Sequence, residues 1–456
     1  MSVPAPTAWL STAVRSTPEA PALIAGSLIM SYAELAGAAE RWRAELADLD
    51  LPGPSNLGVV VRRNPQSMAQ LWAVWESPHT ALLLDAAALD GRDESLFARW
   101  GVAALVDGEN MVEVHGPSGA ADPAHHSWIL TSGSSGAPRP VILTHDNVAA
   151  AVAASQTRLR NDAADRWQLV LPPAHVGGAS VLWRSAAAGG AVVLDEGFDP
   201  SRTAQRFADG AITISSLVPT MLYRLLDHID EVSPEVRAVL VGGAAANEDL
   251  LRRALEVGLP VLATYGLTEA CSQVATVAPG EMWTSVGTVG RPLGGMSVTV
   301  SDPDPTGAGE ITIDGPAVTP GYGGEPLRAG PHRTGDLGRI DDSGRLVVLG
   351  RTDGVIVTGG ENVVPATVER ALEAFPGLQQ AAVVGLPDDE WGEIVVACVV
   401  TTSGAATEGE LRSHARKTLA AADRPKRYVF VESLPELPNG KIDRSAVRSR
   451  IATGDA

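Results

Sequence analysis

The sequence predicts an α/β protein with a large N-terminal domain and a small, mobile α+β C-terminal domain. Short apolar strands alternate with helical patterns up to Thr264, which favours a mostly parallel sheet. From about Val286, glycine and proline become frequent and short alternating strands follow, which indicates a small β-rich subdomain. A further run of helices and strands follows the polar turn at Asp353. We therefore predict domains at 1–352 and 353–456.

Within the large domain, Ser31 and Glu34 have the spacing of a capping box, which predicts a helix that runs toward Leu49. Residues 147–159 are rich in alanine and are predicted to be helical. The run 167–171 is predicted to be a buried strand that ends at Pro172 and Pro173. The other predicted strands are 57–61, 80–84, 191–194, 212–217, 238–241 and 261–264, and a further helix is predicted over 65–75.

The β-rich subdomain is predicted to contain strands over 297–300 and 310–314. Residues 345–350 are predicted to form a strand that leads into the polar turn 351–354. The C-terminal unit is predicted to contain helices 365–374 and 408–419 and strands 380–384, 394–400 and 428–431.

Composition limits the classes of function. The formal net charge of -19 argues against nucleic acid or an anionic membrane as the main partner, and a polyanionic substrate would need a locally positive site. Two cysteines, Cys271 and Cys398, form no disulfide framework, so we predict a reducing, cytoplasmic location. Residues 1–20 lack a signal-peptide pattern, and no run of about 18 apolar residues is present to span a bilayer.

One segment, Trp128 to Val141, indicates phosphate binding. Its glycines, Gly133 and Gly136, let the main chain approach a ligand closely, and successive backbone N–H groups can form an anion-binding nest. The loop follows a buried-looking strand, where α/β sheets place ligand loops, which favours this interpretation over an ordinary Gly/Ser linker. It is not a Walker loop, because no Gly-Lys-Ser/Thr follows. Its hydroxyl donors are Thr131, Ser132, Ser134 and Ser135.

Three other segments carry ionisable groups beside small residues. Glu269 follows Thr264-Tyr-Gly-Leu-Thr268, Asp336 lies between glycines in Thr334-Gly-Asp-Leu-Gly338, and Lys441 ends Pro438-Asn-Gly-Lys441. Considered alone, each residue has an ordinary interpretation: Glu269 as a surface acid, Asp336 as a turn aspartate and Lys441 as a surface lysine. Lysine, however, occurs only at 417, 426 and 441, so a lysine here stands where arginine would not serve.

Together with Gly350-Arg-Thr-Asp353, these motifs resemble the acyl-adenylate-forming superfamily, which comprises acyl-CoA synthetases, peptide-synthetase adenylation domains and luciferases. The resemblance covers nearly the whole chain and keeps the motif order. It implies an ATP site formed by Thr131, Ser132, Gly133, Ser134, Ser135, Gly136, Arg139, Gly242, Gly243, Ala244, Thr264, Tyr265, Gly266, Asp336 and Arg351.

The resemblance also implies individual roles. Residues 131–136 wrap the β- and γ-phosphates, Tyr265 stacks on adenine, and Asp336 accepts hydrogen bonds from the ribose. Thr268 touches the α-phosphate, and Glu269 helps to hold Mg²⁺, a hard cation that shares oxygens with the nucleotide. Lys441 bridges the substrate carboxylate and the α-phosphate.

The implied chemistry has two steps. A carboxylate attacks the α-phosphorus of ATP and expels pyrophosphate, and catalysis is positioning plus electrostatic stabilisation of phosphoryl oxygens. A thiol then attacks the acyl-adenylate and releases AMP. Between the steps, the C-terminal domain turns about a hinge at Asp353, withdraws Lys441 and presents Gly359 and Gly360 to the thiol channel.

One branch is more similar than the others. The segments Leu171–Gly178, Tyr265–Gln273 and Val357–Pro365 resemble those of o-succinylbenzoate–CoA ligases of menaquinone synthesis. The similarity implies that His175 lies at the acid pocket, where the glycines after it leave space for a ring. A packed histidine is the alternative. The implied substrate-binding residues are His175, Gly178, Gly266 and Ser272.

Two departures from the family pattern stand out. Arg139 and Pro140 occupy positions where members usually carry Lys-Gly, and Pro140 would stiffen a loop expected to close over pyrophosphate. Val357 stands where many acyl-CoA synthetases have lysine, but the o-succinylbenzoate branch often lacks it too.

The sequence thus predicts an ATP-dependent acid–CoA ligase that uses ATP, Mg²⁺ and CoA on an aromatic or succinylated aromatic acid such as o-succinylbenzoate. One alternative is a freestanding enzyme that loads an acid onto the phosphopantetheine of a carrier protein, although no carrier domain is visible. A second alternative is a degenerate member that binds nucleotide or acyl-adenylate without turnover. The sequence leaves a homodimer open.

Overall fold

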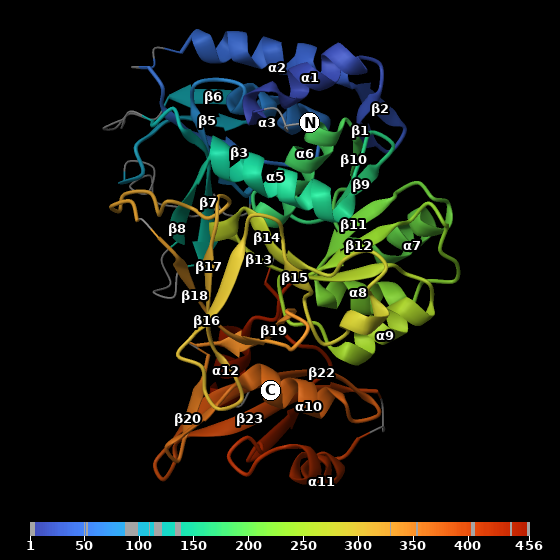
Figure 1. Ribbon diagram of the computed structural model, residues 1–456, viewed down its shortest axis with the longest axis vertical. Coiled ribbons are helices and arrows are strands. Elements are labelled where there is room, and N and C mark those ends of the chain that lie inside the picture. Colours follow the sequence, from blue (N-terminus) through green and yellow to red (C-terminus); the bar gives the residue numbers. More distant parts are fainter. Residues whose placement is uncertain are drawn as a thin grey trace.

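The computed structural model describes residues 5–49, 51, 53–86, 99–108, 110–113, 121–132, 138–328, 330–352, 354–402, 406–437 and 440–453. Four predicted phosphate-loop residues, Gly133 to Gly136, lie outside these ranges, and so does the predicted hinge residue Asp353. The N-terminal domain fills the upper part of Figure 1, and the C-terminal domain, coloured orange to red, lies below it.

The first sheet of the N-terminal domain has nine strands, and its six central strands run parallel. Its antiparallel edges are β2 on one side and β14 and β15 on the other. In spatial order the strands are β15 (Arg291–Pro292), β14 (Ser272–Thr276), β13 (Val261–Leu267), β12 (Ala238–Val241), β11 (Ile214–Leu217), β9 (Arg166–Leu169), β10 (Ala191–Leu194), β1 (Pro21–Ala25) and β2 (Leu28–Ser31).

The second sheet has six strands and carries the phosphate-loop segment on its last two. Its central strands are parallel, and each edge is an antiparallel pair. In spatial order the strands are β6 (Asn110–Glu113), β5 (Val102–Asp107), β3 (Asn56–Val60), β4 (Thr80–Leu84), β7 (His125–Ser132) and β8 (Pro138–Thr144).

Helices pack between and around these sheets, and several begin where sequence chemistry dictates (Figure 1). The side chain of Ser31 accepts a hydrogen bond from the Glu34 amide, and the Glu34 carboxylate accepts one from the Ser31 amide, which confirms the predicted capping box. Thr144 and Asn147 form a second box. Among the described residues, the α-helices of this domain are α1 (Trp9–Ser16), α2 (Tyr32–Ala47), α3 (Pro65–Trp75), α5 (His145–Leu159), α6 (Val176–Ala188), α7 (Pro200–Ala208), α8 (Pro219–Leu226) and α9 (Glu248–Glu256).

The predicted β-rich subdomain is confirmed as a four-stranded antiparallel sheet: β16 (Ser297–Ser301), β17 (Gly309–Asp314), β18 (His332–Ile340) and β19 (Leu346–Arg351). The C-terminal domain is a five-stranded sheet covered by helices, which confirms the predicted α+β class. Its elements are β20 (Ile356–Thr358), β21 (Glu361–Val363), α10 (Pro365–Glu373), β22 (Leu378–Asp388), β23 (Gly392–Thr401), α11 (Glu408–Thr418), β24 (Arg427–Phe430) and α12 (Arg444–Thr453).

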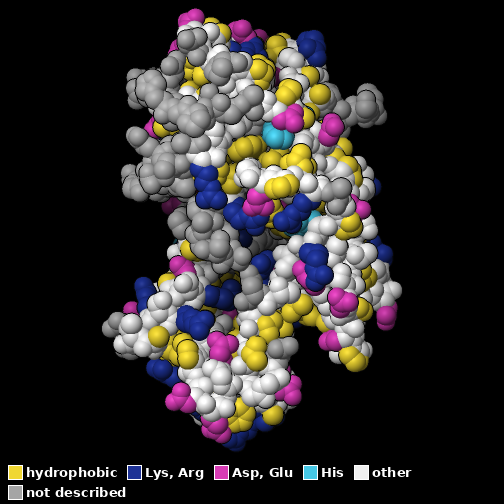
Figure 2. All heavy atoms as spheres, turned by 90° about the vertical axis from the view of Figure 1, so that its left-hand side faces the viewer, with side chains coloured by type: hydrophobic (Ala, Val, Ile, Leu, Met, Phe, Trp, Pro, Cys, Tyr) yellow, Lys and Arg dark blue, Asp and Glu magenta, His cyan; other side chains and the backbone are white. Residues whose placement is uncertain are grey.

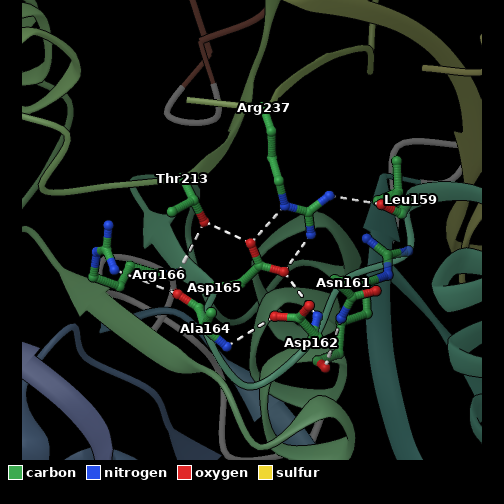
Figure 3. A network of polar contacts seen from close by, with 9 residues as sticks. Leu159, Asn161, Asp162, Ala164, Asp165, Arg166, Thr213 and Arg237 are labelled. Carbon is green, nitrogen blue, oxygen red and sulfur yellow. Dashed lines mark hydrogen bonds and ion pairs between the residues drawn. The ribbon is translucent and has the colours of Figure 1, made fainter. Parts of the chain in front are cut away.

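A buried polar network fixes the amino ends of three strands of the first sheet (Figure 3). Asp165, just before β9, accepts hydrogen bonds from Arg237 before β12 and from the hydroxyl of Thr213 before β11 at 2.7 Å. Arg237 also donates to the Leu159 carbonyl at the end of α5. Burial would raise the pKa of Asp165, but these hydrogen bonds bring it below its usual value. The network therefore lies at the end of the sheet opposite to the carboxyl ends of these strands, where the loops of the predicted site begin.

Several strands are longer than the sequence predicts, including β22, which was predicted over 380–384, and two of these strands lie at the site. The strand before the phosphate loop continues through Thr131 and Ser132, because Thr131 pairs with Arg139 across the β7–β8 hairpin. Likewise β13 continues through Tyr265 to Leu267, paired with β14. Among the described residues, no helix is both long enough and apolar enough to cross a membrane.

Candidate active site

The phosphate-loop segment is a β-hairpin whose described flanks are Thr131, Ser132 and Arg139. The Thr131 hydroxyl donates to the carbonyl of Arg139 at 3.3 Å, which ties the two flanks together. The Arg139 guanidinium lies 3.8 Å above the ring of Tyr322 and forms hydrogen bonds with both carboxylate oxygens of Glu325 at 2.8 Å. The cationic side chain predicted to meet the phosphates is therefore held by two residues that follow β17.

Pro140 lies within strand β8 rather than in the hairpin turn. Its carbonyl accepts a hydrogen bond from the Gly323 amide at 2.8 Å, on the side away from β7. The N and O atoms of one strand residue point to the same side, so the missing N–H of Pro140 also faces away from β7. Proline at this edge costs no β7–β8 hydrogen bond, and its rigidity acts on a strand instead of on the turn.

Glu269 lies in the short 3-10 helix Thr268–Ala270 that follows β13. Its Oε1 accepts a hydrogen bond from the Tyr322 hydroxyl at 3.0 Å, and its carbonyl accepts one from the Thr319 amide. Burial and the nearby Glu269 charge raise the pKa of Tyr322, so the phenol stays protonated and donates. Tyr322 therefore fixes the direction in which the Glu269 carboxylate points.

This arrangement fits Mg²⁺ in the presence of a nucleotide. The described residues hold no group of three or more His, Cys, Asp or Glu side chains placed to bind a metal ion. Mg²⁺ is usually held by one or two carboxylates together with substrate phosphates, and Glu269 supplies one carboxylate beside the phosphate hairpin. Bound there, the ion would neutralise charge on phosphoryl oxygens.

Tyr265, Asp336 and Arg351 come together from β13, β18 and β19. The buried Tyr265 donates its hydroxyl to Asp336 Oδ2 at 2.6 Å, and Arg351 Nη1 donates to Asp336 Oδ1 at 3.1 Å and to the Thr334 carbonyl. Burial, followed by the Asp336 charge, raises the pKa of Tyr265. The Asp336 carboxylate is thus a fixed acceptor, as ribose hydroxyls require.

The loop after β12 approaches the same place through small residues. A Cβ atom on Gly242 would lie 2.6 Å from the side chain of Thr264, and Gly243 has a φ of +80°, so neither position tolerates a larger side chain. Ala244 follows directly in the chain. These small residues bring the loop after β12 against Thr264 at the end of β13, where the resemblance places the adenine.

Lys441 comes from the C-terminal domain but lies in the site of the N-terminal domain. A Cβ atom on Gly243 would lie 3.4 Å from Lys441 Cε and 3.9 Å from its Nζ. Burial lowers the pKa of Lys441, the Asp336 charge raises it and the Arg351 charge lowers it. The ammonium therefore lies beside the Gly243 loop and within electrostatic reach of Asp336.

Contacts between the two domains hold Lys441 there. The Thr220 hydroxyl at the start of α8 donates to the carbonyl of Gly440 at 2.5 Å, and Arg224 pairs with Glu436 at 2.6 Å. A third contact joins the cap of α9 to α10, where the Asn247 amide donates to Glu373 at 3.0 Å. Burial raises the pKa of Glu373 to about 7.

The predicted acid pocket lies where α6 begins and where β13 turns into β14. His175 is the N-cap residue of α6; burial lowers its pKa, while the Asp85 charge raises it and the Lys441 charge lowers it. A Cβ on Gly178 would lie 2.3 Å from the Pro172 carbonyl oxygen. Gly178 therefore serves close packing, and the space expected beside it is filled by the chain itself.

The other predicted acid-binding residues, Gly266 and Ser272, lie close together where β13 and β14 pair, next to a bulge between Tyr265 and Gly266. A Cβ on Gly266 would lie only 1.7 Å from the Ser272 carbonyl oxygen. Cys271 and Ser272 both have positive φ angles, of 51° and 95°. Non-glycine residues adopt this conformation at a cost, so the bulge is a strained feature that the surrounding strands hold in place.

Arg184 on α6 is a buried cation that the sequence analysis missed. It is 2% exposed, and its Nε and Nη2 find no hydrogen-bond partner among the described residues. Burial lowers the pKa of Arg184 to about 9, with Cys271 nearby, so the guanidinium remains charged at neutral pH. An arginine inside the apolar run Val181–Ala186 was the available signal.

His332 on β18 was also missed. Burial lowers its pKa, while the charges of Glu269 and Asp336 raise it. The imidazole therefore lies within electrostatic reach of both predicted nucleotide-binding carboxylates.

The Gly359–Gly360 turn joins β20 to β21 and lies against other residues of the C-terminal domain. A Cβ on Gly359 would lie 2.7 Å from the ring of Trp391, and Lys426 Nζ lies 3.1 Å from the centre of that ring. Figure 2 shows Lys and Arg side chains gathered around a hollow between the two domains. A locally positive surface thus exists on a chain whose net charge is -19.

Comparisons with known proteins agree with this geometry. The chain matches a family model described as AMP-binding enzyme over residues 113–323, and one described as AMP-binding enzyme C-terminal domain over residues 367–441. It is 31% identical to a 2-succinylbenzoate–CoA ligase of Geobacillus kaustophilus over 97% of both chains. It is 35% identical to the corresponding ligase of Listeria monocytogenes, over 71% of this chain and 70% of the relative.

Among solved structures, the chain resembles o-succinylbenzoate CoA synthetase (MenE) from Bacillus subtilis in complex with the acyl-adenylate intermediate OSB-AMP. The TM-score is 0.86 at 28% identity, over 96% of this chain and 97% of that one. The complex of that protein with ATP and magnesium ion has a TM-score of 0.84 at 27% identity, over 96% and 98% of the two chains. A double mutant bound with its product analogue OSB-NCoA gives 0.68 at 28% identity, over 97% and 98%.

The family models together match most of the chain, and the Geobacillus relative matches it from end to end. The motifs that carried the resemblance lie at the carboxyl ends of β7, β13 and β19 and on β18, and Lys441 comes to the site from the second domain. The chain belongs to the AMP-binding enzyme family of acyl-adenylate-forming enzymes, in the branch of acid–CoA ligases that contains the 2-succinylbenzoate–CoA ligases.

Proposed function

We propose that this chain is an ATP-dependent o-succinylbenzoate–CoA ligase. The observation that carries the proposal is the position of Lys441, which enters the N-terminal site beside Gly243 and within electrostatic reach of Asp336 and His175. A compact ammonium there would neutralise both an attacking carboxylate and an α-phosphate. Arginine, a wider planar group, would not fit as well.

In the first step, the carboxylate of the acid attacks the α-phosphorus of ATP, the bond to the bridging oxygen breaks and pyrophosphate leaves. Thr131, Ser132 and Arg139 bind the departing phosphates, and Asp336 holds the ribose. Tyr322 fixes the Glu269 carboxylate, which would hold Mg²⁺. Tyr265 and Tyr322 already hold the Asp336 and Glu269 carboxylates, so these two groups need little reorganisation during the reaction.

Arg184 supports a dicarboxylic substrate. o-Succinylbenzoate carries an aromatic carboxylate in addition to the succinyl carboxylate that can be activated. A buried guanidinium whose Nε and Nη2 have no partner among the described residues is costly unless an anion joins it, and the neighbouring Cys271 lies between Gly266 and Ser272 in the chain. We propose that Arg184 supplies the countercharge for the aromatic carboxylate.

In the second step, the thiol of CoA attacks the acyl carbon and AMP leaves. We propose that the C-terminal domain turns about Asp353 between the steps, withdrawing Lys441 and bringing Gly359 and Gly360 to the thiol channel. This chain has a TM-score of 0.68 with the complex that holds OSB-NCoA and of 0.86 with the complex that holds OSB-AMP. The lower score supports a different domain arrangement in the OSB-NCoA complex. The contacts of Thr220 and Arg224 would form in the first arrangement only.

The test is pyrophosphate release and thioester formation across a panel of aryl and acyl acids, with CoA or an acyl carrier protein as acceptor. We expect o-succinylbenzoate to give release that depends on both ATP and acid, and a CoA thioester. Product on the carrier protein alone would identify a loading enzyme, and no release with any acid despite ATP binding would identify a degenerate member.

Lys441→Ala separates the two steps. We expect this change to abolish adenylation and largely to spare thioester formation from supplied acyl-adenylate, because Lys441 lies beside the predicted phosphate site only in the present arrangement. Equal loss of both steps would contradict the role given to Lys441.

A further inference from the structure

Arg139, the predicted phosphate-binding cation, is already paired with a carboxylate of the protein. Glu325 accepts hydrogen bonds from Arg139 Nη2 at 2.8 Å on both oxygens and from Nε at 3.2 Å. Glu325 thus occupies the Nε–Nη2 edge of the guanidinium, which is the edge suited to a bidentate carboxylate or phosphate. Each side chain is between one third and two fifths exposed, so solvent and ligand can reach the pair.

The position of Glu325 is fixed by its backbone. The Glu325 amide donates to the carbonyl of Tyr322 in a turn that contains Gly324 with a φ of +82°. Just before this turn, Gly321 and Gly323 form backbone hydrogen bonds with strand β8, at Ile142 and Pro140. The carboxylate is therefore held opposite Arg139, which lies on the same strand.

The ring of Tyr322 restricts Arg139 from the other side. The centre of the ring lies 3.8 Å from Arg139 Cζ, and the Tyr322 hydroxyl donates a hydrogen bond to Glu269. The Arg139 guanidinium can therefore stay stacked on the Tyr322 ring while a ligand replaces Glu325 along its Nε–Nη2 edge. Phosphate oxygens bound at that edge would take the place of the Glu325 carboxylate and would also be repelled by its charge.

We propose that Glu325 holds Arg139 in place of the nucleotide phosphates, so that ATP must displace Glu325 and Glu325 then helps to expel pyrophosphate. This assignment rests on the proposed function for the identity of the leaving group. It makes Glu325 a residue that tunes phosphate affinity by competing for one cation, while Arg139 makes the contact with the ligand.

The test is calorimetric binding of Mg·ATP, and separately of Mg·pyrophosphate, to the full chain and to Glu325→Gln in the absence of any acid. An exposed bidentate pair contributes about 0.5–1 kcal/mol, so both ligands should bind the variant about two- to fivefold more tightly. In the Arg139→Gln background, the same change at Glu325 should leave both dissociation constants unaltered, because the two residues act as a pair.

A matched control is Glu408→Gln on α11, where Glu408 forms a similarly exposed pair with Arg412. We expect this variant to bind both ligands as the parent does. Unchanged or weaker binding by Glu325→Gln, or a gain that persists without Arg139, would overturn the proposal. Because no acid is present, failure of o-succinylbenzoate turnover would leave this result unaffected.

Discussion

Replacing Thr220 with valine should slow adenylation and spare thioester formation. The Thr220 hydroxyl donates to the carbonyl of Gly440, the residue before Lys441, at 2.5 Å. Valine keeps the shape of the side chain but removes the donor. When the C-terminal domain is docked, the Gly440 carbonyl then lies against an apolar group, whereas in any other arrangement it can bind water.

The expected size of the effect follows from burial. Thr220 is 8% exposed, and a buried acceptor left without its donor costs about 1–3 kcal/mol. If the loss of the Thr220 donor costs about 1–2 kcal/mol, the population with the C-terminal domain docked as in the present structure falls about five- to thirtyfold relative to the undocked arrangement. The neighbouring Arg224–Glu436 pair is 55% exposed on the arginine side and contributes about 1 kcal/mol at most, so it does not compensate.

The assay compares the two steps separately. Acid-dependent exchange of pyrophosphate into ATP measures adenylation, and thioester formation from supplied acyl-adenylate measures the second step. Thr220→Ser keeps the hydroxyl and is the matched control, so it should behave as the parent. The reasoning fails if valine slows both steps equally, or if serine is as slow as valine.

Three further predictions concern the pocket, the catalytic cation and the fold. Gly266→Ala would place a Cβ 1.7 Å from the Ser272 carbonyl oxygen and displace the pocket wall by more than an ångström, so kcat/KM for the acid should fall about a hundredfold; near-parental kinetics would argue against this wall. Because burial lowers the pKa of Lys441, exchange activity should decline on the alkaline side at a lower pH than free lysine titrates, and Lys441→Arg should lose that decline in its residual activity. Asp165→Asn should destabilise the protein by about 3 kcal/mol near pH 7 by weakening the bonds from Arg237. Since the native pKa of Asp165 is depressed, that stability is present above the unfolded pKa of about 4 and is lost as pH falls through the native pKa, so the difference in denaturation midpoint should shrink in acid.

The sequence predicted elements that local chemistry determines. Helix α3 and strand β4 were predicted at their observed bounds, and the capping box predicted the start of α2. The glutamate, aspartate and lysine motifs could be found because each stands among small residues in a fixed order. These signals depend on neighbours along the chain, which a single sequence shows directly.

Pairings across long separations could not be predicted. The β7–β8 hairpin, which places Arg139 opposite Thr131, depends on register, and the contact of Arg139 with Glu325 joins residues 186 positions apart. The apolar run around Arg184 indicates a buried helix, but it does not reveal which residues surround the guanidinium. Gly178 resembled a gap for a substrate ring, but only coordinates show that the Pro172 carbonyl fills that space.

The most direct test of the proposed function is a coupled measurement on the unmodified chain with ATP, Mg²⁺, CoA and o-succinylbenzoate. Pyrophosphate release and the CoA thioester should appear in equal amounts, and benzoate, which lacks the succinyl chain, should give neither at comparable concentration. Equal turnover of benzoate, or ATP binding with no pyrophosphate release from o-succinylbenzoate, would contradict the proposed function.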